Sequence, residues 1–416
     1  MKIRKLQLKN IGVFDNETIE FQPCPANDKA EIHILTGQNG SGKSTILMAL
    51  ANLFALEVTE KNIAQKDKRF IEENRWFEAK FNLEKNSFEK RLRKNILEIA
   101  DNEFSNTQVS YLVNYKNNLE SYDFNFSIAP LVNFVFVNTL DINSATNEAI
   151  LSYPTRLDEH PNYHLDFAVF AYSGYRQVED ERVEAIKEPN NFNPLLHALD
   201  FVKDYSQDNE ISINQLLANN ISKSAIEKGR NKEKSEKFAN VIKSIERAIS
   251  EITGWKIEFD LETEPTNLVT KVNGQELDFD VLPDGLRSLI SWIADLAGRV
   301  DLLKWQDDLP IFEKNLILFL DEIEVHLHPA WQRKVLPVVQ KLFKNSQIFV
   351  STHSPFVVNS VDDAWVYKLE LENGKAKVGE VIKSEDAWSY SHVLSEIFDI
   401  KEEFGIEVQK DLAAFK

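Results

Sequence analysis

Gly37-Gln38-Asn39-Gly40-Ser41-Gly42-Lys43-Ser44-Thr45 is the stretch that decides the fold of this chain. It matches the phosphate-loop pattern G-x-x-x-x-G-K-[ST] at every specified position. An apolar run at 31–36 precedes it and an apolar helical pattern at 46–54 follows it, so the motif lies between a predicted strand and a predicted helix. In that setting, backbone N–H groups and a helix N-terminus are available to hold the phosphates of a nucleotide.

The loop predicts a role for each of its polar residues. Lys43 is placed to reach the β- and γ-phosphates, and the Ser44 hydroxyl is placed to bind Mg²⁺. The other residues that we expect to contact the nucleotide are Gly37, Asn39, Gly40, Ser41, Gly42 and Thr45. We therefore expect ATP and Mg²⁺ as the cofactors.

Composition narrows the class of protein. The 416 residues are 27% charged and 43% apolar, an ordinary globular balance, and this length predicts one elaborated core or two lobes. Cys24 is the only cysteine, which excludes a disulfide framework and suits a reducing cytoplasm. No run approaches the roughly 18 apolar residues that a membrane helix requires. We expect a soluble cytoplasmic protein without a membrane partner.

The net charge of −18 argues against a general nucleic-acid binder, because phosphate contacts dominate such affinities. Two stretches, 66–94 and 223–247, carry a local excess of Lys and Arg. Such stretches are more typical of solvated faces than of nucleic-acid surfaces. Contact with nucleic acid stays possible.

Three later apolar runs, at 166–172, 315–320 and 347–350, are typical of strands buried on both faces of a sheet. The second run ends in Asp321 and Glu322, and the third leads to His353. Asp321 can hold Mg²⁺ opposite the phosphate-loop hydroxyl, and Glu322 can act as a general base toward a water molecule. His353 can polarise the same water or contact the γ-phosphate.

The order of these motifs resembles the core of ABC-class ATPases. The motifs that carry the resemblance are Gly37–Thr45, a polar turn with Gln177, Leu282-Pro283-Asp284-Gly285, Leu320-Asp321-Glu322 and His353. The N-terminal Leu6-x-Leu8-x-Asn10-Ile11-Gly12-x-Phe14 is similar to the SMC and RecF-like group. Asp321–Pro329 and Ser351–Pro355 are similar to AAA-labelled ATPases of bacterial anti-phage systems, which include OLD nucleases and the PtuA ATPase of Septu systems, some of them retron-linked.

This resemblance implies an α/β ABC-ATPase head with mixed and parallel sheets, flanking helices, two lobes and a helical insertion. Two heads would dimerise head to tail, with each signature loop closing on the γ-phosphate bound by the other. Pro283, Asp284 and Gly285 would form that contact, and Pro283 replaces the usual serine, so we expect slow hydrolysis. Gln177 would be the lid glutamine, in contact with both nucleotide and Mg²⁺.

The domain boundaries follow the same motifs. We expect an N-terminal ATPase lobe at 1–194 with an insertion near 60–165, a helical segment at 195–252, a C-terminal ATPase lobe at 253–383 and a tail at 384–416. His326 and His328 lack a neighbouring metal-ligand set, so we expect Glu324 and His326 to contribute to the dimer seam instead.

No nuclease motif follows His353, so we expect a homodimer or higher oligomer that controls a separate effector, such as an HNH nuclease, in anti-phage defence. The tail residues Trp388, Tyr390, Leu394, Ile397 and Phe398 either contact that effector or pack on the C-terminal lobe. Two other functions stay open: a DNA-repair or chromosome-associated ATPase, and a non-hydrolysing ATP-gated interaction module. A transporter subunit fits the N-terminal pattern least well.

Overall fold

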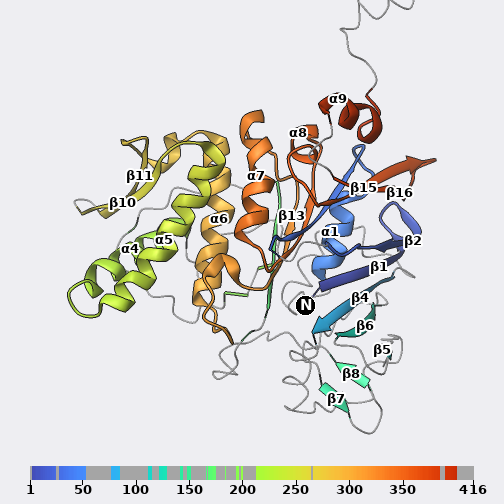
Figure 1. Ribbon diagram of the computed structural model, residues 1–416, viewed down its shortest axis with the longest axis horizontal. Coiled ribbons are helices and arrows are strands. Elements are labelled where there is room, and N and C mark those ends of the chain that lie inside the picture. Colours follow the sequence, from blue (N-terminus) through green and yellow to red (C-terminus); the bar gives the residue numbers. More distant parts are fainter. Residues whose placement is uncertain are drawn as a thin grey trace, which may run out of the picture.

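The structure of the protein, a computed structural model, is shown in Figure 1. It describes residues 2–24, 28–52, 76–84, 111–114, 121–128, 141–143, 148–150, 165, 167–174, 183, 194–195, 198–199, 212–263, 266–384 and 389–400. Two residues named above, Gln177 and Trp388, lie outside these ranges. Among the described residues, no helix has both the length and the apolar character needed to cross a bilayer.

A six-stranded sheet forms the centre of the fold. Its order is β16 (Lys375–Lys383), β15 (Trp365–Glu372), β3 (Glu31–Gly37), β14 (Gln347–Ser351), β13 (Leu316–Leu320) and β9 (Ala168–Tyr172). The strands from β15 to β9 are parallel, and only β16 runs antiparallel to its neighbour. Every residue of β9, β13 and β14 is buried, as the unbroken apolar runs predicted.

A second, antiparallel sheet begins with the N-terminal hairpin. Its order is β2 (Phe14–Glu20), β1 (Lys2–Ile11), β4 (Trp76–Glu84), β6 (Ser121–Ile128) and β5 (Tyr111–Asn114). The short strands β7 (Asp141–Asn143) and β8 (Glu148–Ile150) pair beside it. The predicted insertion therefore contributes strands to the N-terminal sheet. Its expected limits, like those of the two lobes, stay predictions.

Helices cover the central sheet and extend to one end of the molecule (Figure 1). They are α1 (Lys43–Asn52), α4 (Ile213–Glu227), α5 (Lys232–Thr253), α6 (Asp284–Leu302), α7 (Pro329–Leu342), α8 (Pro355–Val358) and α9 (Tyr390–His392), with the shorter turns η2 (Phe279–Val281), η3 (Ile311–Glu313) and the π-helical η4 (Val393–Ile397). A small antiparallel sheet of β10 (Ile257–Thr263), β11 (Thr266–Val272) and β12 (Gln275–Leu277) lies beyond α5.

Local sequence explains where the long helix α5 begins and ends. The Asn231 side chain accepts a hydrogen bond from the Lys234 amide at the N-terminus, and Gly254 ends the helix with φ of 75°. Its buried residues recur at helical spacing, from Val241 to Ile252, and they pack toward α6 and α7. After Gly254, β10 and β11 pair as an antiparallel hairpin.

The described part of the tail packs on the central domain, which is the second of the two alternatives above. Ile397 is 2% exposed, and the Tyr390 ring stacks on Phe356 with centroids 5.0 Å apart. Lys368 on β15 forms an ion pair with Asp399 at 2.7 Å. Val393 and Ile397 therefore belong to the core, whereas Tyr390 is 38% exposed and contact of the tail with an effector stays a prediction.

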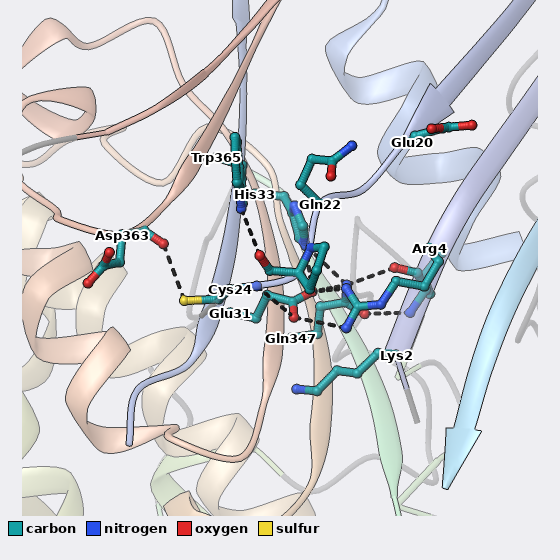
Figure 2. Close-up of polar contacts among 12 residues, drawn as sticks. Lys2, Arg4, Glu20, Gln22, Cys24, Glu31, His33, Gln347, Asp363 and Trp365 are labelled. Atoms are coloured by element: carbon teal, nitrogen blue, oxygen red, sulfur yellow. Dashed lines mark hydrogen bonds and ion pairs between the residues drawn. The ribbon is translucent and has the colours of Figure 1, made fainter. Parts of the chain in front are cut away.

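A buried polar network joins the N-terminal sheet to the central sheet, and Figure 2 shows its side chains converging on Glu31. Arg4 on β1 donates to Glu31 through both terminal nitrogens, at 2.5 and 3.0 Å. Gln347 on β14 donates to the same carboxylate at 2.7 Å and bonds both backbone polar groups of Ile3. Side chains from β1 and β14 therefore bond to one carboxylate on β3.

The surroundings of Glu31 determine its protonation. Burial alone would raise the pKa of Glu31, but the hydrogen bonds from His33 and Arg4 and the positive charge of Arg4 outweigh it and hold the pKa well below its usual range. Burial lowers the pKa of His33, so we assign a neutral ring that donates to Glu31 and accepts from the Tyr367 hydroxyl. The ionised Glu31 carboxylate thus stabilises the folded state above the ordinary glutamate pKa of about 4.3 and loses this effect as pH falls below it.

Replacing Arg4 by alanine should lower the free energy of unfolding at pH 7 by about 2 kcal/mol, because a charge-assisted hydrogen bond is lost from a buried carboxylate. Since Arg4 stabilises only ionised Glu31, the difference from wild type should shrink as pH falls below the ordinary glutamate pKa of about 4.3 toward the depressed pKa of folded Glu31. Denaturant titrations across this range would measure it. Lys375→Ala, which breaks an exposed pair with Asp15, is the control. A difference that stayed constant with pH would contradict the assignment.

Candidate functional site

The phosphate loop is shaped by the two elements that flank it. It runs from the end of β3 at Gly37 to the start of α1 at Lys43. Gly37 has φ of 143°, and a Cβ atom there would lie 2.3 Å from the carbonyl oxygen of Leu369 on β15. A Cβ atom on Gly42, with φ of 93°, would lie 2.4 Å from the Phe14 ring of the N-terminal hairpin. Both positions therefore require glycine.

Lys43 lies buried at the centre of the loop. Its Nζ donates to the backbone carbonyls of residues 37–38, each at 2.9 Å. Burial lowers the pKa of Lys43 to about 8. The charges of Asp321, Glu322 and Glu324 act in the opposite direction. Phosphate oxygens would be further acceptors for the same ammonium.

Ser44 and Asp321 are brought into direct contact, although 277 positions separate them in the chain. The Ser44 hydroxyl donates to Asp321 Oδ1 at 3.1 Å, and the Ser351 hydroxyl donates to the same oxygen. Asp321 directly follows β13 and is 8% exposed. A hydroxyl and a carboxylate are oxygen donors of the kind that Mg²⁺ prefers, so these residues fit the metal.

The described residues include no group of three or more His, Cys, Asp or Glu side chains that could hold a metal by themselves. This agrees with a site in which nucleotide and water would complete the coordination of Mg²⁺, because Mg²⁺ is usually held by one or two carboxylates and phosphates. Gln177, the third metal ligand expected from the resemblance, lies outside the described residues.

Glu322 has a left-handed backbone, with φ of 46°. Such a conformation is uncommon for a residue other than glycine, and it is held here by the Glu322 amide, which donates to Ser351 Oγ at 2.8 Å. The side chain lies over Gly174, where a Cβ atom would come within 2.9 Å of Glu322 Oε2. Sequence reasoning missed Gly174, whose only signal was its place in the polar turn after a buried strand.

His353 is tied to the loop that carries the carboxylates. Its amide donates to Glu324 Oε1 at 2.6 Å. Burial, followed by the charge of Lys43, lowers the pKa of His353, so the ring is neutral at pH 7. Glu324 accepts the His353 amide within its own chain, and its expected contribution to a dimer seam stays a prediction.

Pro283, Asp284 and Gly285 form the N-terminus of α6. Pro283 is the N-cap residue and provides no side-chain cap, whereas Asp284 pairs with Arg287 one turn later. A Cβ atom on Gly285 would lie 2.6 Å from the carbonyl oxygen of His326. This glycine is therefore required by the loop that follows β13 in the same chain. The Arg287 charge offsets that of Asp284, which leaves the helix N-terminus suitable for an anion.

A pocket of about 430 Å³ opens beside this helix terminus. Its lining residues are Trp255, Pro283, Asp284, Gly285, His326, His328 and Trp331. The two tryptophan rings meet edge to face with centroids 4.9 Å apart. The structure thus divides the predicted residues into two groups: the phosphate loop with Asp321, Glu322 and His353, and the signature residues with the loop at 326–328.

The relatives found by comparison with known proteins include a retron protein and a Septu protein. The "Retron Vc95 probable ATPase" of Vibrio cholerae serotype O1 biovar El Tor is 27% identical over 387 residues, which cover 86% of this chain and 72% of that protein. The "Septu protein PtuA" of Bacillus thuringiensis is 23% identical over 154 residues, which cover 34% of this chain and 37% of that protein. The predicted resemblance to this group is confirmed.

Among solved structures, an SMC head bound to the C-winged helix domain of ScpA aligns with 93% of this chain and 100% of its own, with a TM-score of 0.50 and 14% identity. At that identity the match shows the fold, and it confirms the predicted α/β head. Residues 32–359 match the family model described as "AAA domain, putative AbiEii toxin, Type IV TA system". Because the match runs from β3 to the residue after α8, this chain belongs to that AAA-domain family.

Proposed function

We propose that this protein is an ABC-type ATPase head that binds ATP with Mg²⁺, hydrolyses it and dimerises on ATP to control a separate effector in anti-phage defence. The observation that carries the proposal is the contact between Ser44 and Asp321, beneath a phosphate loop and beside Glu322 and His353. Relatives whose names contain "retron" and "Septu" support the defence role.

For nucleotide binding, we assign the β- and γ-phosphates to Lys43 and the backbone amides of the phosphate loop. Ser44 and Asp321 would hold Mg²⁺, which supplies positive charge to the phosphate oxygens when it is bound. The nearly complete burial of Lys43, at 6% exposure, supports this role, because a buried ammonium gains most from a fixed anionic partner.

For hydrolysis, we assign the general base to Glu322. Its carboxylate would take a proton from the water that attacks the γ-phosphorus, as the bond to the β–γ bridging oxygen breaks and ADP leaves. The place of the Glu322 side chain against Gly174 supports the assignment, because Gly174 follows β9 at the same edge of the central sheet as Asp321. The neutral His353 ring would orient the water or the γ-phosphate.

For dimerisation, we assign the signature residues to the γ-phosphate bound by a second head. The N-terminus of the 19-residue helix α6 supports an anion contact there, and the Asp284 charge that would oppose it is paired with Arg287. Val281, just before Pro283, is 62% exposed, which supports a surface that is covered in an assembly. The effector would bind elsewhere, and an HNH nuclease is the class that we expect.

A second candidate function is a non-hydrolysing, ATP-gated interaction module. The observation that favours it is Pro283, which offers neither a hydroxyl nor an N–H group where a serine would offer both. Comparing the rate of turnover with the affinity for ATP would separate the two functions.

Lys43→Ala should weaken ATP binding by about 100-fold or more, because hydrogen bonds to charged groups contribute about 1.5–3 kcal/mol each. Isothermal titration calorimetry with Mg²⁺ and ATP would measure this change. Lys341→Ala, an exposed lysine on α7, is the matched control and should bind like wild type. Undiminished affinity in the Lys43 variant would refute the phosphate-loop assignment.

Glu322→Gln should retain ATP and Mg²⁺ but lose about 10²–10⁴-fold in turnover, because it removes a single general base. The unreacted nucleotide should then hold two heads together, so light scattering in the presence of ATP should give twice the mass of one chain. Wild-type turnover would remove Glu322 from the mechanism. An unchanged mass would argue against dimerisation on ATP.

Pro283→Ser should raise turnover, because the added hydroxyl can donate to the γ-phosphate of the second head with about 1.5–3 kcal/mol. Steady-state phosphate release would report the change. A variant that turns over no faster than wild type would show that the proline does not limit closure.

A further inference from the structure

The loop that follows β13, residues 321–328, is bonded along its length to the histidine loop, residues 351–354. At one end, the Ile323 amide donates to the Ser351 carbonyl at 3.4 Å. At the other end, Gln332 on α7 accepts from Ser354 Oγ at 2.6 Å and donates to the Leu327 carbonyl at 2.8 Å. The two loops therefore move as one unit unless these bonds break.

Glu324 makes the central bond of this unit. Its Oε1 atom accepts the His353 amide at 2.6 Å, and the Thr352 side chain bonds to the same carboxyl group. The other oxygen, Oε2, is buried and has no hydrogen-bond partner within the part of the chain that the structure describes. The carboxyl group is thus directed at the backbone of the histidine loop.

Glu324 influences groups that we assign to the proposed reaction. Its negative charge raises the pKa of Lys43 against the effect of burial, and Glu322 lies two positions away in the chain. Burial, with a contribution from Glu322, raises the pKa of Glu324, whereas the hydrogen bonds from His353 and Thr352 lower it. Glu324 already accepts a backbone amide through one oxygen, and its second oxygen is buried. The carboxyl group is therefore poorly placed to contact substrate.

We propose that Glu324 is a positioning residue, which fixes the His353 ring beside the phosphate loop by holding the His353 amide. The inference rests on the ATPase activity proposed above. It assigns a role within one chain to the second acidic residue of the Glu322-Ile323-Glu324 sequence, for which the sequence predicted only a contribution to a dimer seam. Glu324 would affect the rate of hydrolysis through His353. It would not affect the binding of ATP, which we assign to the phosphate loop.

The first test compares Glu324→Ala with Glu324→Gln, because glutamine keeps an oxygen that can accept the His353 amide. Glu324→Ala should lower kcat by about 10- to 100-fold with little change in KM, as expected for a misplaced catalytic group. Glu324→Gln should stay within about threefold of wild type. Glu236→Ala, an exposed residue on α5, is the control. Equal losses in the alanine and glutamine variants, or a loss confined to KM, would overturn the proposal.

A double-mutant cycle asks whether Glu324 acts through His353. If it does, adding Glu324→Ala to His353→Ala should change kcat by less than about threefold, because there is no longer a ring to position. Independent action would instead multiply the two effects. A further loss of about 10-fold or more in the double variant would overturn the proposal.

Amide hydrogen exchange tests the same contact without relying on turnover. In the full-length protein without nucleotide, the peptide covering 351–354 should exchange about 10-fold faster in Glu324→Ala than in wild type or Glu324→Gln. Unchanged exchange in the alanine variant would overturn the inference, whatever the activity. If wild type releases no phosphate while exchange behaves as predicted, the proposed hydrolysis fails and the contact at His353 is still established.

Discussion

One carboxylate oxygen, Asp321 Oδ1, joins the three chain segments on which this structure depends. It accepts hydrogen bonds from Ser44 at the start of α1 and from Ser351 at the end of β14. Parallel strands make this possible, because the carboxyl ends of β3, β13 and β14 all lie at one edge of the central sheet. Opposing strand directions would have separated the same residues by the length of a strand.

The N-terminal sheet contacts the central sheet both at the phosphate loop and at the amino ends of β3 and β14. Phe14 packs against Gly42, and the Arg4, Glu31 and Gln347 network bonds β1 to β3 and β14 at their amino ends. The phosphate loop is therefore fixed by contacts with β15 and the hairpin, and not by its own sequence alone. Glycine at positions 37 and 42 is the consequence of those close approaches.

Much of the fold could be predicted from local pattern. Unbroken apolar runs identified β9, β13 and β14, because burial on both faces of a sheet leaves no polar alternation. Polar residues placed directly after those runs identified the contact between Ser44 and Asp321, since parallel strand ends share an edge. The family followed from the order of the same motifs.

The remaining features depend on contacts between distant segments, which local pattern does not encode. Gly174 lies under Glu322, and Gly285 lies against the His326 carbonyl, yet each reads in sequence as an ordinary turn or helix start. Glu324 was expected to contribute to a dimer seam, which stays a prediction, and its bond to the His353 amide could not be seen in the sequence. The sequence left the packing of the tail open, and the contacts of Ile397 and Tyr390 show it.

We expect Ser44 and Asp321 to form the Mg²⁺ site of a bound ATP, and a crystal structure with Mg²⁺ and a non-hydrolysable ATP analogue would test this. The metal ion should lie about 2.0–2.1 Å from Ser44 Oγ, with Asp321 bound to it directly or through one water molecule. Phosphates should occupy the loop at 37–45, with Lys43 Nζ turned toward them. A nucleotide bound elsewhere, or a metal ion that contacts neither Ser44 nor Asp321, would contradict it.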